Sequence, residues 1–204
     1  MKGTGPDRTA PDDVDDAAVI EGSVRDPERF AVIFDRHAPH IQRYLARRLG
    51  QEIADDLVSE TFLIAFRKRS RYDLGRRDAR PWLYGIASNL IGQHQRDEAR
   101  EYRLWQAMAR EEHEASHAER ASTEATTQAV RQRLANALAQ LSPGDRDVLL
   151  LIAWEELSYD EVASALAIPV GTVRSRLHRA RGKVRLALAD ANPTTTFEEI
   201  CQNG

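Results

Sequence analysis

A run of basic side chains near the C-terminus is the clearest sign of binding chemistry in this sequence. The stretch PVGTVRSRLHRARGKVR, residues 169–185, contains no acidic residue, although the formal net charge of the chain is -3. Guanidinium groups pair with phosphates and with guanine edges, so the stretch predicts contact with a polyanion. The basic residues are Arg174, Arg176, Arg179, Arg181, Lys183 and Arg185.

The basic run is expected to lie on a helix with two different sides. At about 100° per residue, Val170, Val173, Leu177, Ala180 and Val184 gather on one side. The preceding segment SYDEVASALAIP predicts a helix with one buried stripe, formed by Tyr159, Val162, Ala163 and Leu166. The short connection at residues 168–171 forces a sharp change of direction between the two helices. This spacing is typical of a helix-turn-helix, whose second helix enters the DNA major groove.

Several side chains on the polar side of that helix are candidate DNA contacts. Thr172 lies near the helix start, where it either caps the helix or contacts a phosphate. Ser175 is small enough to let the helix approach DNA closely. The alternative is that this basic face is only solvated and binds no partner. The preceding helix and the turn argue against this alternative. The predicted contact residues are Thr172, Arg174, Ser175, Arg176, His178 and Arg179.

The stretch DDLVSETFLIAFRK, residues 55–68, predicts a helix with two apolar sides. Ile53, Leu57 and Ile64 cluster on one side, while Val58, Phe62 and Ala65 lie nearly opposite. One side would pack in the core and the other against a protein partner, with surrounding charges setting the register. The alternative is a central helix that is buried all round.

A second candidate site lies around RPWLYGIASNLIGQHQRDEAR, residues 80–100. Trp82 and Tyr84 follow the basic loop RYDLGRRDAR, and aromatic rings beside a positive surface can stack on unpaired bases. The alternative is that both rings are core anchors. Asn89 is a further candidate, as a reader of a base edge.

The chain is predicted to be all-α, with two helical domains joined by a flexible linker, because no alternating strand pattern is present. Helices are expected from Pro27 onwards, with Pro39 starting a new turn or a kink. The later helices are expected at residues 51–67, 80–96, 127–141, 143–154, 159–167 and 171–189. The predicted divisions are an acidic disordered tail at 1–26, a first domain at 27–99, a partly helical linker at 100–126, a second domain at 127–188 and a tail at 189–204.

Several classes of protein do not fit this sequence. It lacks an apolar run long enough to span a membrane and an apolar signal region, so we expect a soluble protein of the cytoplasm without membrane insertion. Its one cysteine, Cys201, provides neither a disulfide frame nor a zinc site. Without a nucleophile–base pair, a metal cluster or a glycine-rich phosphate loop, we expect no enzyme activity, no cofactor and no metal.

Four segments, in order, resemble an extracytoplasmic-function sigma factor, a bacterial RNA polymerase specificity subunit of the sigma-70 family. They are DDLVSETFLIAFRK, RPWLYGIASNL, LSPGDRDVLLL and LSYDEVASALAIPVGTVRSRLHRAR, and the resemblance covers roughly residues 27–188. It implies a sigma2-like first domain that binds the beta-prime clamp of core polymerase, reads the minus-ten element and assists promoter opening. It implies a sigma4-like second domain that reads the minus-thirty-five element and contacts the beta flap. An anti-sigma partner is implied as well.

The resemblance also implies roles for individual residues. Those on the polymerase-binding helix are Asp55, Asp56, Leu57, Glu60, Thr61, Phe62 and Phe66. Those expected at the minus-ten element and in strand opening are Arg76, Arg77, Trp82, Asn89 and Arg96. The helix at 171–189 would lie in the upstream major groove, as its two-sided pattern already indicates.

Two features of the sequence differ from the family pattern. Two other classes of protein also remain open as alternatives. The segment IGQHQRDEAR has less positive charge than is usual there, and both termini lie outside the pattern. A stand-alone helix-turn-helix regulator would bind DNA without polymerase, but this interpretation leaves the first domain unexplained. A protein-binding adaptor would leave the arginine-rich face without a role.

Overall fold

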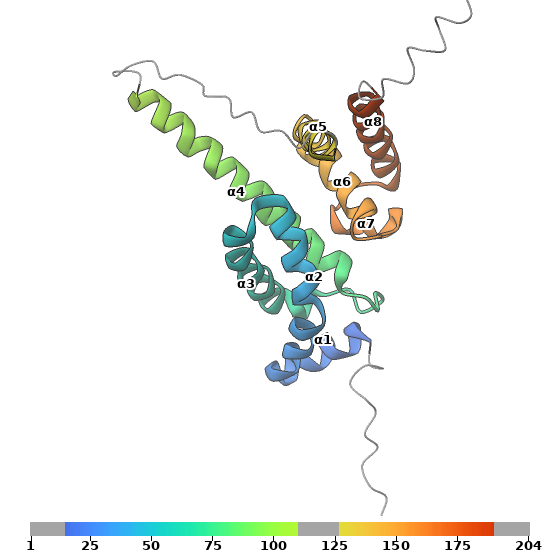
Figure 1. Ribbon diagram of the computed structural model, residues 1–204. Coiled ribbons are helices and arrows are strands. Elements are labelled where there is room, and N and C mark those ends of the chain that lie inside the picture. Colours follow the sequence, from blue (N-terminus) through green and yellow to red (C-terminus); the bar gives the residue numbers. More distant parts are fainter. Residues whose placement is uncertain (1–14, 110–126, 190–204) are drawn as a thin grey trace, which may run out of the picture. The chain divides into compact units, whose positions relative to one another are not determined.

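A computed structural model describes residues 15–109 and 127–189, and every regular element within these ranges is a helix (Figure 1). The chain divides into two units, residues 1–91 and 92–204, with the boundary inside one long helix. The predicted all-α architecture with two helical domains is confirmed. The elements are α1 Asp16–Arg25, η1 Pro27–Phe30, α2 Ala31–Leu49, α3 Gln51–Lys68, η2 Arg69–Arg71, α4 Arg80–Ala109, α5 Thr127–Ala139, α6 Pro143–Ala153, α7 Tyr159–Ala165 and α8 Val170–Ala189.

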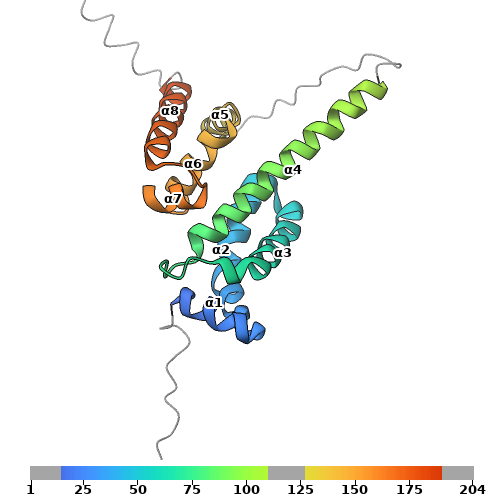
Figure 2. The same cartoon turned by 180° about the vertical axis from the view of Figure 1, so that it is seen from behind.

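The core of the first unit is built around α2, α3 and the start of α4. Helices α2 and α3 lie side by side in both views and are joined at Gly50, whose φ of 89° suits a residue without a Cβ (Figures 1 and 2). Tyr44 and Tyr84 are fully buried, with ring centroids 5.3 Å apart in an edge-to-face contact. The Tyr44 hydroxyl lies 3.1 Å from Ser88 Oγ, so α2 and α4 share a buried hydrogen bond.

The prediction of an acidic disordered tail at residues 1–26 is wrong for residues 16–25, which form α1. The Asp15 side chain caps this helix by accepting a 2.9 Å hydrogen bond from the Ala18 amide. Val19 and Ile20 are buried against the unit. The acidic composition misled the prediction because Asp16 is itself buried and paired, which a count of acidic residues does not reveal. Residues 1–14 lie outside the described part of the chain.

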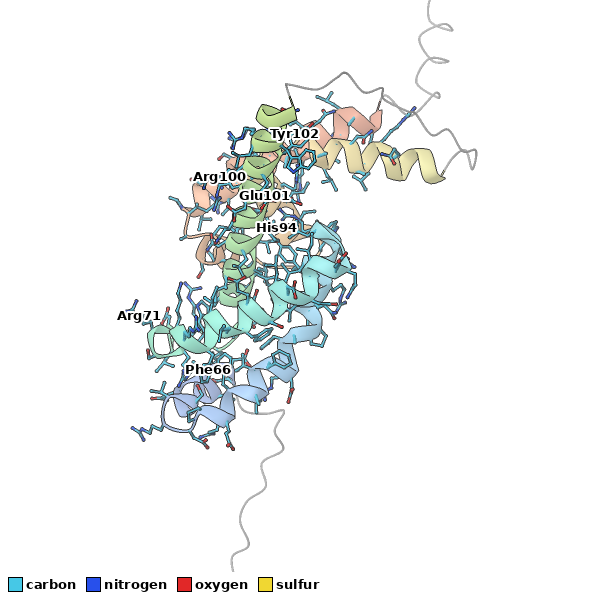
Figure 3. All side chains as sticks on the ribbon, turned by 90° about the vertical axis from the view of Figure 1, so that its left-hand side faces the viewer. Phe66, Arg71, His94, Arg100, Glu101 and Tyr102 are labelled. Atoms are coloured by element: carbon cyan, nitrogen blue, oxygen red, sulfur yellow. The ribbon has the colours of Figure 1, made fainter. Side chains whose placement is uncertain are left out.

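Pro39, where a new turn or a kink is expected, lies inside α2. One expected helix end needs correction. Helix α4 continues to Ala109, well past the predicted end at residue 96 and into the predicted linker. The side chains of residues 96–106 are all exposed, and Figure 3 shows Arg100, Glu101 and Tyr102 on this part of α4. Good helix formers therefore extend the helix without a core to pack against. The remainder of the predicted linker, 110–126, lies outside the described residues, as does 190–204.

The second unit contains α5, α6, α7 and α8. Ser142 caps α6 by accepting a hydrogen bond from the Asp145 amide, with Pro143 at the first helical position, as the sequence predicts. Ser158 and Glu161 form a reciprocal capping box at the start of α7. The largest fully buried side chains of the described part of the unit are Val148, Leu151, Val162 and Val173.

Helices α7 and α8 form the predicted helix-turn-helix. Ala167 adopts a positive φ of 51° in the turn, and the amide of Ile168 donates to the carbonyl of Ala163, which closes the end of α7. Val162 and Ala163 are buried as predicted, whereas Tyr159 is 37% exposed, so its predicted place in the buried stripe is wrong. Tyr159 is the first residue of α7, and at this end of the helix its side chain is only partly covered. Among the described residues, no helix is long and apolar enough to cross a membrane.

Candidate functional site

Helix α8 has one buried side and one exposed basic side, as its sequence predicts. Val173, Leu177 and Ala180 face the core. Arg174, Ser175 and His178 are exposed on the opposite side. Ser175 Oγ donates a 3.0 Å hydrogen bond to the Thr172 carbonyl, which keeps this small side chain close to the helix. Helix α8 can therefore lie against a second surface without losing its packing.

Arg179 makes a contact within the protein that sequence reasoning missed. Its Nη2 donates to Asp145 Oδ1 at 3.0 Å, and its Nε donates to Oδ2 at 3.5 Å. The Arg179 side chain remains 54% exposed, whereas that of Asp145 is 7% exposed. The neighbouring Arg176 is half-buried, and its guanidinium lies against Gly144 at the start of α6.

The Asp145 carboxylate is an ionised group in this cluster. Burial acts to raise its pKa, but hydrogen bonds from Arg179 and Ser142, together with the charges of Arg179 and Arg176, lower the pKa below its usual value. A carboxylate with so little exposure requires a cationic partner, and Arg179 supplies it. The candidate DNA-binding face of α8 thus has one arginine held by a buried acid.

Hydrogen bonds made by Tyr72, within the loop, and by Asp16 of α1 fix the loop between η2 and α4. Tyr72 Oη lies 2.7 Å from the Arg76 carbonyl and 3.1 Å from that of Asp78. Burial and the Asp16 and Asp78 carboxylates raise the pKa of the Tyr72 hydroxyl, so it remains a donor. The Asp16 carboxylate accepts a 2.9 Å hydrogen bond from the Ala79 amide. The loop therefore has a defined shape at its start and its end.

The basic residues of this loop point outward. The side chain of Arg77 is 88% exposed, with its Nε 3.7 Å from Asp15. The side chain of Arg76 is 45% exposed, and its Nε lies 3.2 Å from Asp73. Both ion pairs are at the surface and are weak in water. Their guanidinium groups remain accessible to a polyanion.

The aromatic residues at the start of α4 separate into two roles. Trp82 is half-buried and its ring lies 4.9 Å from that of Tyr72, which places it beside the loop. Tyr84 is 1% exposed, so the alternative of a core anchor is correct for it. Asn89 and Arg96 are exposed further along α4.

Asp16, His37 and Asp78 bring potential metal ligands within 4.8 Å of one another. The Asp16 carboxylate already accepts hydrogen bonds from Arg36 and from the Ala79 amide, and it lies 2.7 Å from His37 Nε2. Both oxygens of Asp78 accept from Arg80. The cluster is a hydrogen-bonded network that joins α1, α2 and the loop, and a cation would have to displace these bonds.

The predicted polymerase-binding helix α3 exposes its acidic residues and one apolar side chain, Leu63, which is 47% exposed. Leu57, Thr61 and Phe62 are buried, with Thr61 Oγ1 donating 2.6 Å to the Leu57 carbonyl. The ring of Phe62 packs edge-on against Phe34, with centroids 4.9 Å apart. A second apolar side reserved for a partner is thus absent at Leu57 and Phe62, since the unit's own core covers both.

The exposed side of α3 carries acidic residues. Asp55, Asp56 and Glu60 are exposed, and Asp55 accepts hydrogen bonds from Gln42 and Gln51. Phe66, near the end of α3, is half-buried (Figure 3). Its ring packs edge-on against Phe30 and lies 3.8 Å below the guanidinium carbon of Arg69. Phe66 therefore supports the end of the helix from inside the unit.

The two units correspond to two known families of domain. Residues 33–101 match Sigma-70 region 2, and residues 131–184 match Sigma-70, region 4. The RNA polymerase sigma factor CarQ of Myxococcus xanthus is 36% identical over 164 residues, which cover 80% of this chain and 91% of CarQ. This chain belongs to the sigma-70 family. It is an RNA polymerase sigma factor of the extracytoplasmic-function group.

Other relatives place the sigma factor in the same group. The ECF RNA polymerase sigma factor SigL of Mycobacterium tuberculosis is 32% identical, over 79% of this chain and 90% of SigL. The ECF RNA polymerase sigma factor SigW of Bacillus subtilis is 31% identical, over 81% of this chain and 91% of SigW.

Solved structures support the fold of this sigma factor. CnrH, in complex with the cytosolic domain of CnrY, is 27% identical with a TM-score of 0.58, covering 87% of this chain and 98% of CnrH. RpoE of Bartonella quintana, in complex with the anti-sigma factor NepR, has the same TM-score at 24% identity, covering 78% of this chain and 96% of RpoE. Sigma region 2 and region 4 domains imply RNA polymerase and promoter DNA as partners.

Proposed function

We propose that this sigma factor is a non-enzymatic specificity subunit that reads two promoter elements with its two helical units while bound to core polymerase. The observation that carries the proposal is the order of a region 2 domain and a region 4 domain, the second of which exposes the basic side of a helix-turn-helix. A helix with this arrangement fits the major groove.

The upstream, minus-thirty-five element is read by α8. Arg174, Ser175 and His178 are exposed on one side of the helix and supply the base-edge contacts. Arg176 and Arg179 supply charge from the edge of α8 that lies against α6, while Thr172 at the helix start contacts a phosphate. Phosphate contacts make this binding depend strongly on salt.

The downstream, minus-ten element is read by the loop that precedes α4 and by the exposed side of α4. Arg76 and Arg77 contact the backbone of the displaced strand, because their guanidinium groups are accessible. Trp82 packs against the ring of Tyr72, which holds the loop. Because Trp82 is only half-buried, it can also stack on a base. Asn89 and Arg96 extend this surface along α4.

Core polymerase binds the acidic side of α3 through the beta-prime clamp, and the second unit contacts the beta flap. Asp55, Asp56 and Glu60 are the members of the predicted set that a partner can reach. The buried members hold α3 in place. They are Leu57, Thr61, Phe62 and the half-buried Phe66.

An anti-sigma factor regulates this protein in the cytoplasm. This part of the proposal is supported by RpoE of Bartonella quintana, a sigma factor of the same fold whose structure is a complex with the anti-sigma factor NepR. A partner that covers the α3 surface would prevent assembly with polymerase, and one that covers the α8 surface would prevent promoter binding, so the same surfaces serve both activity and its control.

Run-off transcription tests the function. Core RNA polymerase from the organism of origin is combined with the full chain and a library of genomic promoter fragments, and the transcripts are sequenced. Asp56→Arg should abolish transcription by preventing assembly, while Arg179→Ala should reduce it at the promoter. Glu21→Arg, a charge reversal at an exposed position of α1, is the matched control and should transcribe like the unmodified protein.

If the protein is instead a stand-alone regulator, the same transcription experiment should give the opposite result. It binds a duplex tightly without polymerase and adds no transcript to those of core polymerase. That result, with Asp56→Arg indistinguishable from the unmodified protein, would refute the sigma mechanism.

A further inference from the structure

Asp145 lies outside the expected DNA-contacting residues but touches one of them, Arg179. Asp145 is in the first turn of α6, and Arg179 is on α8, 34 residues later. The backbone amide of Asp145 donates to Ser142 Oγ at 3.3 Å, so the residue is fixed by the cap of its own helix. Its carboxylate is therefore a rigid acceptor aimed at α8.

The pairing uses one particular edge of the guanidinium. Asp145 accepts from Arg179 Nη2 at 3.0 Å and from Nε at 3.5 Å, which is the side edge of the planar group. The Nη1 amino group and the outer N–H of Nη2 are not used by this pair. Those donors form the end edge, which matches the N7 and O6 acceptors of guanine. The ion pair and a guanine can thus bind the same arginine simultaneously.

The pair also limits where that end edge can point. A free arginine loses rotamer entropy when it is fixed, and the part lost in the free protein is not lost again on binding. Arg179 remains 54% exposed at its side chain while its inner edge is held by a group that is 7% exposed. The guanidinium is therefore both accessible and oriented.

The start of α6 accommodates a second arginine of α8 in the same place. A Cβ at Gly144 would lie 2.5 Å from Arg176 Nη1, so the missing side chain leaves room for that guanidinium. The Arg176 charge also helps to lower the pKa of Asp145. One acid and one glycine of α6 thus determine the positions of two arginines on the candidate DNA-binding face.

We propose that Asp145 is a specificity-determining positioning residue, which holds the end edge of Arg179 outward so that it selects a guanine in the upstream promoter element. This inference rests on the proposed promoter-reading function of α8. It assigns to α6 a part in base selection, although Asp145 itself does not touch DNA.

The test uses holoenzyme made from core polymerase and the full chain, with a promoter whose upstream element is randomised. Transcripts are sequenced to obtain the base preference at every upstream position. The variants are Asp145→Asn, Arg179→Ala and the double variant, and Asp160→Asn is the matched control. Asp160 is an exposed acid of α7, so its variant removes the same charge from the same unit.

Arg179→Ala should remove the guanine preference at one or two positions. Asp145→Asn should weaken the preference about five- to tenfold at those positions alone, because an amide offers one acceptor where the guanidinium edge needs two. In the Arg179→Ala background, Asp145→Asn should have no further effect on base preference. Asp160→Asn should keep the preferences of the unmodified protein.

Three results would overturn the inference. The preference is unchanged in Asp145→Asn, or it falls equally at all positions, or Asp145→Asn still changes it when Arg179 is alanine. The last two would mean that Asp145 acts through the fold of the unit, which a thermal unfolding curve of each variant would record separately. Failure of the unmodified protein to yield any transcript would refute the proposed function and this inference together.

Discussion

The Asp16 carboxylate lies 2.7 Å from His37 Nε2, and the same carboxylate oxygen accepts a 2.9 Å hydrogen bond from the Ala79 amide. The Asp16 amide in turn donates to the Arg77 carbonyl at 3.0 Å. One residue of α1 therefore joins α2 to the loop that presents the candidate strand-binding arginines. Helix α1 is therefore an integral part of the first unit.

Replacing Asp16 by alanine should destabilise the first unit by about 3 kcal/mol, because it leaves buried donors of His37 and Ala79 without their acceptor. Urea unfolding followed by circular dichroism measures the change. Asp26→Ala is the control, since Asp26 is exposed and its side chain caps no helix. Equal unfolding midpoints for the two variants would contradict the buried network.

Acid should unfold the protein through Asp16 and Asp145, both of which have a pKa below the ordinary value of 3.8. Burial opposes ionisation of Asp16, but its hydrogen bonds to His37, Ala79 and Arg36 outweigh that effect. A lowered pKa in the folded state means stability that is complete above the unfolded pKa and is lost as the pH falls towards the folded pKa.

The measurement is the urea midpoint at a series of pH values from about 5 down to about 2. The unmodified protein should lose stability across this range. A variant carrying Asp16→Asn and Asp145→Asn should be less stable at neutral pH and show a flatter dependence. Parallel curves for the two proteins would show that other carboxylates cause the acid unfolding.

Gly144→Ala should alter DNA binding without weakening the fold. Alanine is the better helix former by up to about 1 kcal/mol, but its Cβ would displace the Arg176 guanidinium, which lies 2.5 Å from that position. We expect a loss of about threefold in promoter affinity, which corresponds to the low end of the net free energy of one ordinary hydrogen bond. Gly182→Ala is the control, because a Cβ there meets no atom within 4 Å.

Thermal unfolding and titration of holoenzyme onto a labelled promoter report the two effects of the glycine variants separately. Both variants should unfold at or above the temperature of the unmodified protein. Only Gly144→Ala should bind more weakly. Equal promoter affinities for Gly144→Ala and Gly182→Ala would exclude a role for the space beside Gly144.

Tyr72→Phe should impair promoter opening more than promoter binding. The substitution keeps the ring packed on Trp82 but removes the hydroxyl that bonds the Arg76 and Asp78 carbonyls. Run-off yield from a duplex promoter should fall several-fold, and a template with a pre-opened minus-ten segment should restore it. Tyr102→Phe, at an exposed position of α4, is the control. An equal loss on both templates would place the defect elsewhere.

The sequence predicts the helices of this protein well where apolar residues recur at helical spacing. The buried side of α8, formed by Val173, Leu177 and Ala180, and the Ser142 cap of α6 are confirmed, because both depend on residues close together in the chain. Helix α1 is missed because the partner of its buried acid, His37, is 21 residues away. Composition cannot indicate such a pair.

The candidate site is less predictable than the helices that carry it. Exposure of Arg174 and His178 follows from the helical pattern, but the Arg179–Asp145 pair depends on how α6 packs against α8. The two apolar sides of α3 left two alternatives open, and the burial of Leu57 and Phe62 favours the core. In each case the deciding contact joins two different helices.

The central claim is that two helical units of one chain read two promoter elements in a single complex with polymerase. Chemical footprinting of the holoenzyme on one transcribed promoter tests it most directly. We predict two protected segments, with thymines near the transcription start made reactive to permanganate, and weaker protection of the upstream segment alone in Arg179→Ala. A single protected segment that forms equally well without core polymerase, and no reactive thymine, would contradict the account.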